Sequence, residues 1–453
     1  MFTEVPYGLC YDCEKLQTIN MSPNTKSIGK EAFYLCKSMK SISFPEGLTV
    51  IDTLAFNRCD SLVQLPLPST LRLIHEGAFK RCSQLEQISI PASVDSIGSG
   101  VFNDCKALHQ FTVEKGNTPL KFWSQHSWMG WSTVFRGIEN LETVIMGRPV
   151  KSDIPSTYGC KNLLSFEYTY AADEVADNQF DGCTNLREVT FCGTPARIGR
   201  EAFRQCDSLV SLNLPEGVTS IDEMAFYYCQ SLEHVGLPQS LSVIGKEAFR
   251  ACKKFERFTV PAQVDSIANE VFNECSNLKT VVFAPSSKPL TYVDALRGAP
   301  IDTIYLDRDI QSLNGRIDSE SAKKLYVGTH VSSLGDGLFT YCGSLDEIYC
   351  LNPVPTVCEG ANVFMYLDKS KCRLHVPIGS LDAYKEAFVW KDFFNIDEVS
   401  GVSAVSNDAA TISAYYTLDG RRISGQPATK GLYIVRSAKG RLQGKNGKKV
   451  MVK

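Results

Sequence analysis

Cysteine is the residue type in this sequence whose number and spacing could do chemistry. The chain has 17 cysteines in 453 residues, and twelve of them share one position of a 23-residue repeat: Cys13, Cys36, Cys59, Cys82, Cys105, Cys160, Cys183, Cys206, Cys229, Cys252, Cys275 and Cys342. Thiols can form disulfides, bind zinc or carry out redox reactions. Strands stacked about 4.8 Å apart would bring neighbouring thiols within disulfide range.

Other residues at this position argue against bridging. The repeat places Gly298 there in one copy and Ile138 in another. A position that accepts Gly, Ile and Cys is best explained as a small buried filler, because free cysteine packs as a small hydrophobe. We therefore predict reduced, buried thiols. The C-x-x-C pair Cys10–Cys13 is interpreted as part of the first coil, and the sequence predicts neither a metal nor another cofactor.

The histidines do not indicate catalysis. They occupy different positions of the repeat and lack the spacing of metal ligands; they are His75, His109, His126, His234, His330 and His375. The sequence also lacks a P-loop, a G-x-S-x-G elbow and a dinucleotide-binding fingerprint. We therefore predict that the protein is not an enzyme.

The element that positions the cysteines is a block of 23 residues, A-F-x-x-C-x-x-L-x-x-I-x-I-P-x-x-V-x-x-I-x-x-x. A fixed period of this size with L-x-x-L-x-L spacing is typical of a leucine-rich repeat solenoid. We predict a β-rich solenoid of about fifteen coils with short helical or irregular turns. Their leucine positions are Leu16, Met39, Leu62, Leu85, Leu108, Leu141, Leu163, Leu186, Leu209, Leu232, Phe255, Leu278, Ile301, Ala322 and Leu345.

Each coil should contain two extended segments and one aromatic ring in the core. The residues three and five after the leucine should face inward, because side chains alternate along a strand. The V-x-x-I stretch should form the second, shorter extended segment. The phenylalanines should stack as an aromatic spine: Phe33, Phe56, Phe79, Phe102, Phe203, Phe226, Phe249 and Phe272.

The composition predicts three parts: a solenoid over 1–398 with a helical cap at 380–398, a linker over 399–412, and a small basic β-unit over 413–453 with strands at 415–418, 431–435 and 449–452. The last part has ten Lys/Arg and one acid, a net charge of +9, so the rest carries −12. A basic tail can indicate nucleic acid or anionic surfaces. We interpret it as a solvated β-unit and predict no nucleic-acid partner. No run reaches the ~18 apolar residues of a membrane span.

The start of the chain has no secretory leader, and the first coil begins almost at once. Because a solenoid needs an end cap, this favours a sequence that begins inside a longer precursor or has lost its leader. Residence in the cytoplasm is the alternative.

Two parts of the sequence resemble known families, and these resemblances imply where in the cell the protein is located. The segment Glu201–Pro215, E-A-F-R-Q-C-D-S-L-V-S-L-N-L-P, and its other copies over residues 5–398 resemble the BspA-like class of leucine-rich repeats. This implies a bacterial surface or secreted protein, since several members are adhesins that bind host matrix proteins or other cells. The segments 416–423, 430–435 and 447–453 are similar to C-terminal sorting domains of anaerobic Gram-negative bacteria. They imply export through the type IX route to the outer cell surface.

Two groups of aromatic residues are candidate binding sites. Tyr305, Tyr326 and Tyr349, followed by His375, occupy the outward position four residues after the leucine. Such a stripe suits an interface, or it stabilises the strands by cross-strand packing. Trp123, Trp128 and Trp131 lie in an insertion of about ten residues between Leu108 and Leu141. This loop either contacts a ligand or folds back to fill a gap.

Together these features predict an adhesion or protein-binding scaffold that recognises a host or partner macromolecule through its exposed strands. The ligand would be a protein or a glycan, host extracellular matrix included. The alternatives are a structural spacer that displays another element, and a surface protein that captures glycans by stacking sugar rings on the aromatic stripe.

Overall fold

The computed structural model describes residues 3–123, 134–135, 137–151, 156–292, 295–311 and 316–399, and the backbone of four strands between residues 412 and 452. It is a parallel β-solenoid of about 16 turns with almost no helix, which confirms the predicted fold. The turn beyond the predicted fifteen is formed around Arg373–Pro377, a strand expected only to close the last coil. The chain divides into two compact units, Met1–Ser240 and Leu241–Lys453.

In the first unit, the L-x-x-I-x-I segments form parallel strands. One sheet contains β5 (Gln87–Ile90), β7 (Gln110–Val113), β9 (Thr143–Met146), β11 (Ser165–Tyr168) and β13 (Glu188–Phe191), and a second contains β15 (Ser211–Asn213) and β17 (His234–Gly236). Equal repeat positions are paired, as in Gln87 with Gln110. In β5 the two isoleucines are buried and the residues between them exposed. The predicted inward and outward positions are therefore correct in this strand, whereas Tyr305, predicted to face outward in the second unit, is buried.

The second extended segment of each coil also stacks in parallel. One sheet consists of β1 (Glu4–Val5), β2 (Ser27–Ile28), β3 (Val50–Ile51), β4 (Leu73–Ile74), β6 (Ser96–Ile97), β8 (Leu120–Phe122) and β10 (Val150–Lys151). Further along the unit lie β12 (Glu174–Val175), β14 (Arg197–Ile198) and β16 (Ser220–Ile221). Coils that contribute strands of both kinds, such as those of β5 and β7, are thus held together along two faces.

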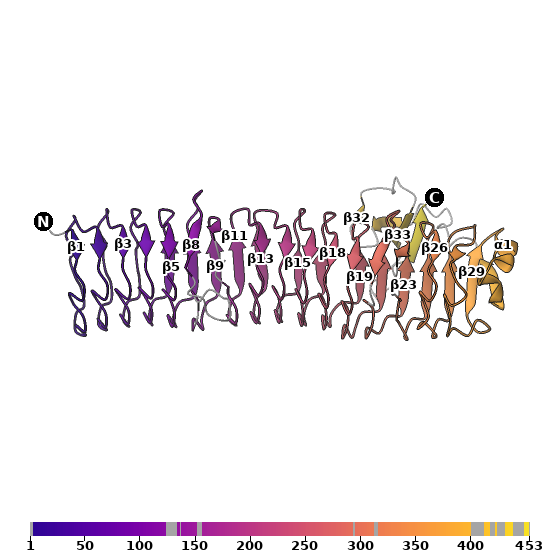
Figure 1. Ribbon diagram of the computed structural model, residues 1–453, viewed down its shortest axis with the longest axis horizontal. Helices are drawn as coiled ribbons and strands as arrows, with labels where there is room; N and C mark the ends of the chain where they lie inside the picture. The colour runs from indigo at the N-terminus through magenta and orange to yellow at the C-terminus, as the bar shows by residue number, and fades with distance from the viewer. Residues whose placement is uncertain are drawn as a thin grey trace. The chain divides into compact units, whose positions relative to one another are not determined.

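The second unit repeats this plan. Its long strands, which run in the same direction in Figure 1, are β19 (Arg257–Val260), β21 (Thr280–Phe283), β23 (Thr303–Leu306), β25 (Lys324–Val327), β27 (Glu347–Cys350), β29 (Arg373–Pro377) and β30 (Asn395–Val399). Its short strands are β18 (Val243–Ile244), β20 (Ser266–Ile267), β22 (Leu290–Tyr292), β24 (Ile310–Gln311), β26 (Ser333–Leu334) and β28 (Val357–Cys358).

The helical run predicted after Ser380 is short. It consists of α1 (Leu381–Glu386) and the 3-10 turn η1 (Trp390–Asp392), and residues 395–399 form strand β30. Tyr384 and Trp390 are fully buried and donate hydrogen bonds to the carbonyls of Asn352 (2.8 Å) and Thr356 (2.7 Å). These bonds attach the segment to the last coil.

The C-terminal strands form an antiparallel sheet in the order β32-β31-β33-β34. They are β31 (Ile412–Tyr416), β32 (Arg422–Ile423), β33 (Gly431–Ser437) and β34 (Lys448–Val452). Of these, β33 and β34 match predicted strands closely, and β31 overlaps the strand predicted at 415–418 in two residues. The linker predicted over 399–412 lies, between residues 400 and 411, outside the described residues.

The predicted aromatic spine is present. In the first unit, ring centroids are 5.1 Å apart between Phe33 and Phe56, 5.5 Å between Phe56 and Phe79, and 5.9 Å between Phe79 and Phe102, and all four rings are fully buried. Phe249 and Phe272 stack at 6.3 Å in the second unit. The rings lie face to face because equal positions of successive coils are paired.

The ladder thiols have a specific partner. Cys59, Cys82 and Cys105 each donate a hydrogen bond of 3.2–3.3 Å to the carbonyl of the spine phenylalanine 26 residues earlier. Cys206 and Cys229 in the first unit and Cys275 in the second do the same. Burial raises the pKa of the Cys105 thiol to about 12, which keeps it protonated as a donor. All 17 cysteines, each within the described residues, are free thiols.

This arrangement predicts a small number of reactive thiols. At pH 8, Ellman's reagent should react quickly with Cys13 and Cys192, which are exposed, and more slowly with Cys10. All 17 should react after denaturation. Cys13→Ser together with Cys192→Ser should remove the fast phase. A count near zero in the denatured protein would mean that the thiols are oxidised.

The A-F-x-x-C segment is not helical, because residues in the left-handed region interrupt it. In the regular coils, one lies five positions before the cysteine and one directly before it, as in Leu54 (φ 56°) and Arg58 (φ 61°) before Cys59. Gly77 takes the first of these positions in the next coil. Between them, Leu54, Phe56 and Arg58 donate backbone hydrogen bonds to the following coil. The turn thus continues the hydrogen bonding of the strands.

Each unit contains one irregular module with a buried arginine. The loop between β7 and β8 is long, at 114–119, and the corresponding loop in the next coil is short, at 147–149. Arg148 in this short loop is fully buried. It donates hydrogen bonds to the carbonyls of Ala92 (2.9 Å), Thr118 (3.3 Å), Pro91 (3.3 Å) and Val94.

The second unit repeats the module at 284–289 and 307–309. Arg308 is fully buried and donates to the carbonyls of Pro261 (3.3 Å), Ala262 (3.2 Å) and Lys288 (2.9 Å). Burial lowers the pKa of both arginines. The two modules therefore share a long loop, a short loop in the next coil and a buried arginine.

Candidate functional site

The tyrosine stripe predicted from the sequence forms one continuous column in the second unit. Strands β23, β25, β27 and β29 pair in register, so Tyr305, Tyr326, Tyr349 and His375 follow one another on adjacent strands. Their ring centroids are 4.3, 4.6 and 4.3 Å apart, with interplanar angles of 12°, 7° and 18°. We call these four residues the aromatic column.

Stacking decides which part of each ring can meet a ligand. Both faces of Tyr326 and Tyr349 are covered by the neighbouring rings. Their edges and hydroxyl ends are what remains for contact. Tyr305 is 6% exposed, while Tyr326 and Tyr349 are half-buried. Burial raises the pKa of Tyr349 to about 12, so the phenol stays protonated at neutral pH.

Charged side chains line the column. Lys324 and Glu347 pair across adjacent strands, with 2.6 Å between Nζ and Oε2. The Tyr349 hydroxyl donates to the Glu347 carboxylate at 3.1 Å. Hydrogen bonding from Lys324 lowers the pKa of Glu347. The Arg257 guanidinium lies 5.8 Å from the Tyr305 ring centroid, within the range of a cation–π contact.

His375 ends the column as a buried side chain, 7% exposed. Its Nδ1 lies 2.7 Å from Oδ1 of Asp397 on β30, although the geometry is not that of a hydrogen bond. The imidazole therefore lies close to the Asp397 carboxylate without a hydrogen bond to it, and its ring stacks on Tyr349.

The second candidate group is described in part. Trp123 follows β8 in the first unit and is 62% exposed. Trp128 and Trp131 lie outside the described residues. Trp123 and the aromatic column belong to different units, so they are treated as separate candidates.

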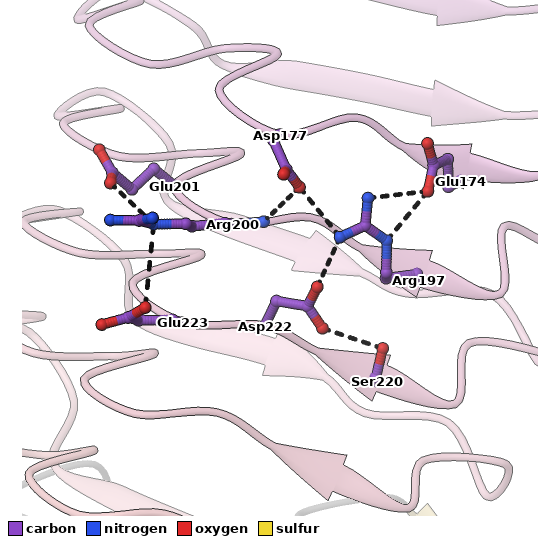
Figure 2. Close-up of polar contacts among 8 residues, drawn as sticks. All are labelled: Glu174, Asp177, Arg197, Arg200, Glu201, Ser220, Asp222 and Glu223. Atoms are coloured by element: carbon purple, nitrogen blue, oxygen red, sulfur yellow. Dashed lines mark hydrogen bonds and ion pairs between the residues drawn. The ribbon is translucent and has the colours of Figure 1, made fainter.

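A cluster of charged residues in the first unit was missed in the sequence (Figure 2). Arg197 contacts Glu174 at 2.8 Å, Asp177 at 2.9 Å and Asp222 at 2.6 Å, so one guanidinium joins three successive coils. Arg200 adds contacts to Glu201 and Glu223 at 3.2 and 3.8 Å. The sequence pattern that could have indicated this cluster is a pair of opposite charges at the same repeat position of successive coils, as in Glu174 and Arg197, which are 23 residues apart.

The charge cluster is best explained as a structural clamp. Burial would lower the pKa of Arg197, but the hydrogen bonds that its guanidinium donates to Asp222 and Glu174 outweigh it and raise the pKa. The side chain is 34% exposed and every nearby carboxylate has a cationic partner. Such an arrangement links three successive coils, and its carboxylates outnumber its guanidinium groups.

The described residues contain no group of three or more His, Cys, Asp or Glu side chains placed to hold a metal ion. Within the same residues, no helix has the length and apolar character needed to cross a membrane.

Comparison with known proteins gave one family. Its model, the BspA type leucine-rich repeat region, matches in six copies over residues 3–125, 131–210, 155–279 and 196–317. No curated protein matches the chain.

Solved structures of similar proteins come from several bacteria. A leucine-rich repeat protein from Bacteroides ovatus is 18% identical, with 88% of each chain covered and a TM-score of 0.37. A leucine-rich cell surface protein from Faecalibacterium prausnitzii is 19% identical, covering 69% of this chain and 84% of that one, with a TM-score of 0.35. A leucine-rich repeat protein from T. pallidum is 23% identical over 43% of this chain and 78% of that one, with a TM-score of 0.29.

Proposed function

The chain belongs to the BspA-type leucine-rich repeat family, and from this premise we propose that it is a bacterial surface or secreted scaffold that binds a partner macromolecule through its exposed strands. The observation that carries the proposal is the change along the outward positions. In the first unit they hold small polar, exposed side chains such as Ser211 and Asn213. In the second unit they hold the aromatic column.

The column supports contact with a protein surface, host extracellular matrix proteins included. Tyrosine is enriched at the centres of interfaces because it joins a large apolar ring to a hydrogen-bonding end. Here the rings are held rigid by their neighbours, so little side-chain entropy is lost on binding. Lys324 and Glu347 provide charges of both signs beside the rings.

The geometry is less favourable for capture of glycans on the column. A sugar ring binds an aromatic side chain through the face of the ring. The faces of Tyr326 and Tyr349 are already occupied. We therefore favour a protein ligand for this surface.

Replacing Tyr326 should separate binding from stability. Tyr326→Phe keeps the stack and removes one hydroxyl, and we expect it to weaken binding about tenfold. Tyr326→Ala should weaken binding further and also lower the melting temperature, because it interrupts the column. The measurement is surface plasmon resonance of the full chain against immobilised collagen, laminin and fibronectin.

Tyr158→Ala is the matched control, because Tyr158 is an exposed tyrosine of the first unit. It should bind as the unchanged protein does. If Tyr326→Phe and Tyr326→Ala both bind normally, the column has a structural role and the proposed contact surface is wrong.

A structural spacer is the second candidate function. It is favoured by the small polar outward residues of the first unit, among them Gln87, Ser89, Ser211 and Asn213, which present no apolar patch. A spacer would bind none of the immobilised proteins, and its function would depend on the number of coils.

We also propose that residues 413–453 act as a sorting domain for export to the outer cell surface. The resemblance of their segments to such domains and the antiparallel sheet of β31 to β34 support this role. With the same secretory leader placed before both, a chain that ends at residue 412 should then stay in the periplasm of its host, while the full chain reaches the surface. Equal surface labelling of the two chains would contradict the proposal.

A further inference from the structure

A slot beside Trp123 is a candidate site that is independent of the aromatic column. We propose that His75, Gly98 and Trp123 bind one neutral sugar ring of a glycan. This inference goes beyond the protein-binding function proposed above, since it concerns the short strands of the first unit and another ligand class.

The three residues occupy one position of three successive coils. Strands β4, β6 and β8 are paired so that Ile74, Ile97 and Phe122 are neighbours. The residue after each strand donates its amide to the preceding coil: His75 to Ile51 (2.9 Å), Gly98 to Ile74 (2.7 Å) and Trp123 to Ile97 (2.9 Å). His75 and Trp123 therefore stand on either side of Gly98.

Gly98 places no side chain between them, and its backbone lies close against that of His75 and Glu76. A Cβ atom at this position would lie 2.4 Å from the amide nitrogen of Glu76 and 2.6 Å from the carbonyl carbon of His75, so only glycine fits. Two strand spacings separate the backbones of His75 and Trp123 by about 9.6 Å. One ring in contact on both sides needs about 7–8 Å, because carbon atoms in contact lie about 3.5–4.0 Å apart, so a separation of this size is wide enough for one ring.

The residues that line the pocket indicate which class of ligand it can bind. The pocket has a volume of about 510 Å³ and is also lined by Thr53, Glu76, Ser96 and Ser99. Volumes of this size are typical of small-molecule sites. Trp123 is 62% exposed, which is high for the largest apolar side chain and leaves indole surface for a ligand.

The polar groups around the indole are hydroxyls, an imidazole and one carboxylate. Among the described residues that line the pocket there is no lysine or arginine to bind an anion. A ligand that matches this lining has an apolar face for the indole and several hydroxyl groups for the rim. A neutral pyranose has both, whereas a phosphate or a sulfated sugar would lack a cation.

The test is a glycan array probed with the full chain, followed by isothermal titration with the oligosaccharide that gives the strongest signal. Trp123→Ala should weaken binding at least about tenfold, and His75→Ala should weaken it less. Both side chains are exposed, so the melting temperature should stay unchanged. Phe394→Ala is the matched control, because it removes another exposed aromatic ring, 81% exposed, and should bind normally.

Silence on the array would overturn the proposal, as would normal binding by Trp123→Ala and His75→Ala. Tyr326→Phe distinguishes the two sites. If it abolishes glycan binding while Trp123→Ala does not, the sugar binds at the aromatic column and the slot is wrong. Loss of protein binding by Tyr326→Phe leaves the slot proposal unaffected.

Discussion

Arg148→Met is expected to lower the free energy of unfolding of the first unit by about 3 kcal/mol. Methionine fills similar space but donates no hydrogen bond. The carbonyls of Pro91, Ala92, Val94 and Thr118 would lose their guanidinium donor within the core. Release of the desolvation cost of the buried charge offsets part of this loss. The largest effect should be near the irregular module, because each coil contacts only its neighbours.

Denaturant unfolding of the full chain measures the total effect, and hydrogen exchange over residues 91–122 measures the local one. Arg148→Lys should be intermediate, since an ammonium group cannot reach all four carbonyls. Arg187→Ala removes an exposed arginine of the same unit and should change stability by less than about 0.5 kcal/mol. An equally small change for Arg148→Met would show that the module does not depend on its arginine.

Phe79→Ala is expected to cost about 3–5 kcal/mol. The ring is fully buried and stacks on Phe56 at 5.5 Å and on Phe102 at 5.9 Å, so its removal leaves a cavity between two rigid neighbours. The coils cannot easily close this cavity, because β3, β4 and β6 pair on one face and β5 pairs with β7 on the other. Denaturant unfolding with a probe in the first unit measures the loss.

Phe79→Leu is the matched comparison. It retains much of the buried volume and should cost about 1–2 kcal/mol. The double variant Phe56→Ala with Phe79→Ala should differ from the sum of the single variants, because the two rings are in contact. Strict additivity would mean that the rings act as separate core residues and not as a spine.

The fold could be predicted because the repeat carries the same information many times. The 23-residue period gave the solenoid, and the alternation in segments such as Gln87–Ile90 gave the buried positions. The stripe of Tyr305, Tyr326 and Tyr349 was visible because strand residues at equal repeat positions become neighbours. Whether the stripe binds a ligand stays a prediction.

The buried arginines and the left-handed backbone positions could not be predicted, because these residue types usually lie on the surface or in right-handed conformations. Arg148 and Arg308 are buried, although arginine is rarely buried. Leu54 and Arg58 have left-handed backbones that favour glycine, and the hint was the glycine that other coils have at these positions, as in Gly77, Gly100 and Gly182. The cysteine ladder was predicted as a filler, but its hydrogen bond to the spine carbonyl depends on the exact turn geometry.

The bond from each ladder thiol to the coil before it has a consequence for how the array changes in length during evolution. Cys59, Cys82 and Cys105 make the same contact, so recombination that adds or deletes one whole block among them restores the bond between thiol and carbonyl at the new junction. Copy number can therefore drift within the regular coils. The irregular modules limit this change in copy number. Arg148 donates a hydrogen bond to the carbonyl of Pro91, 57 residues earlier, so a block gained or lost between these two residues would break the contact.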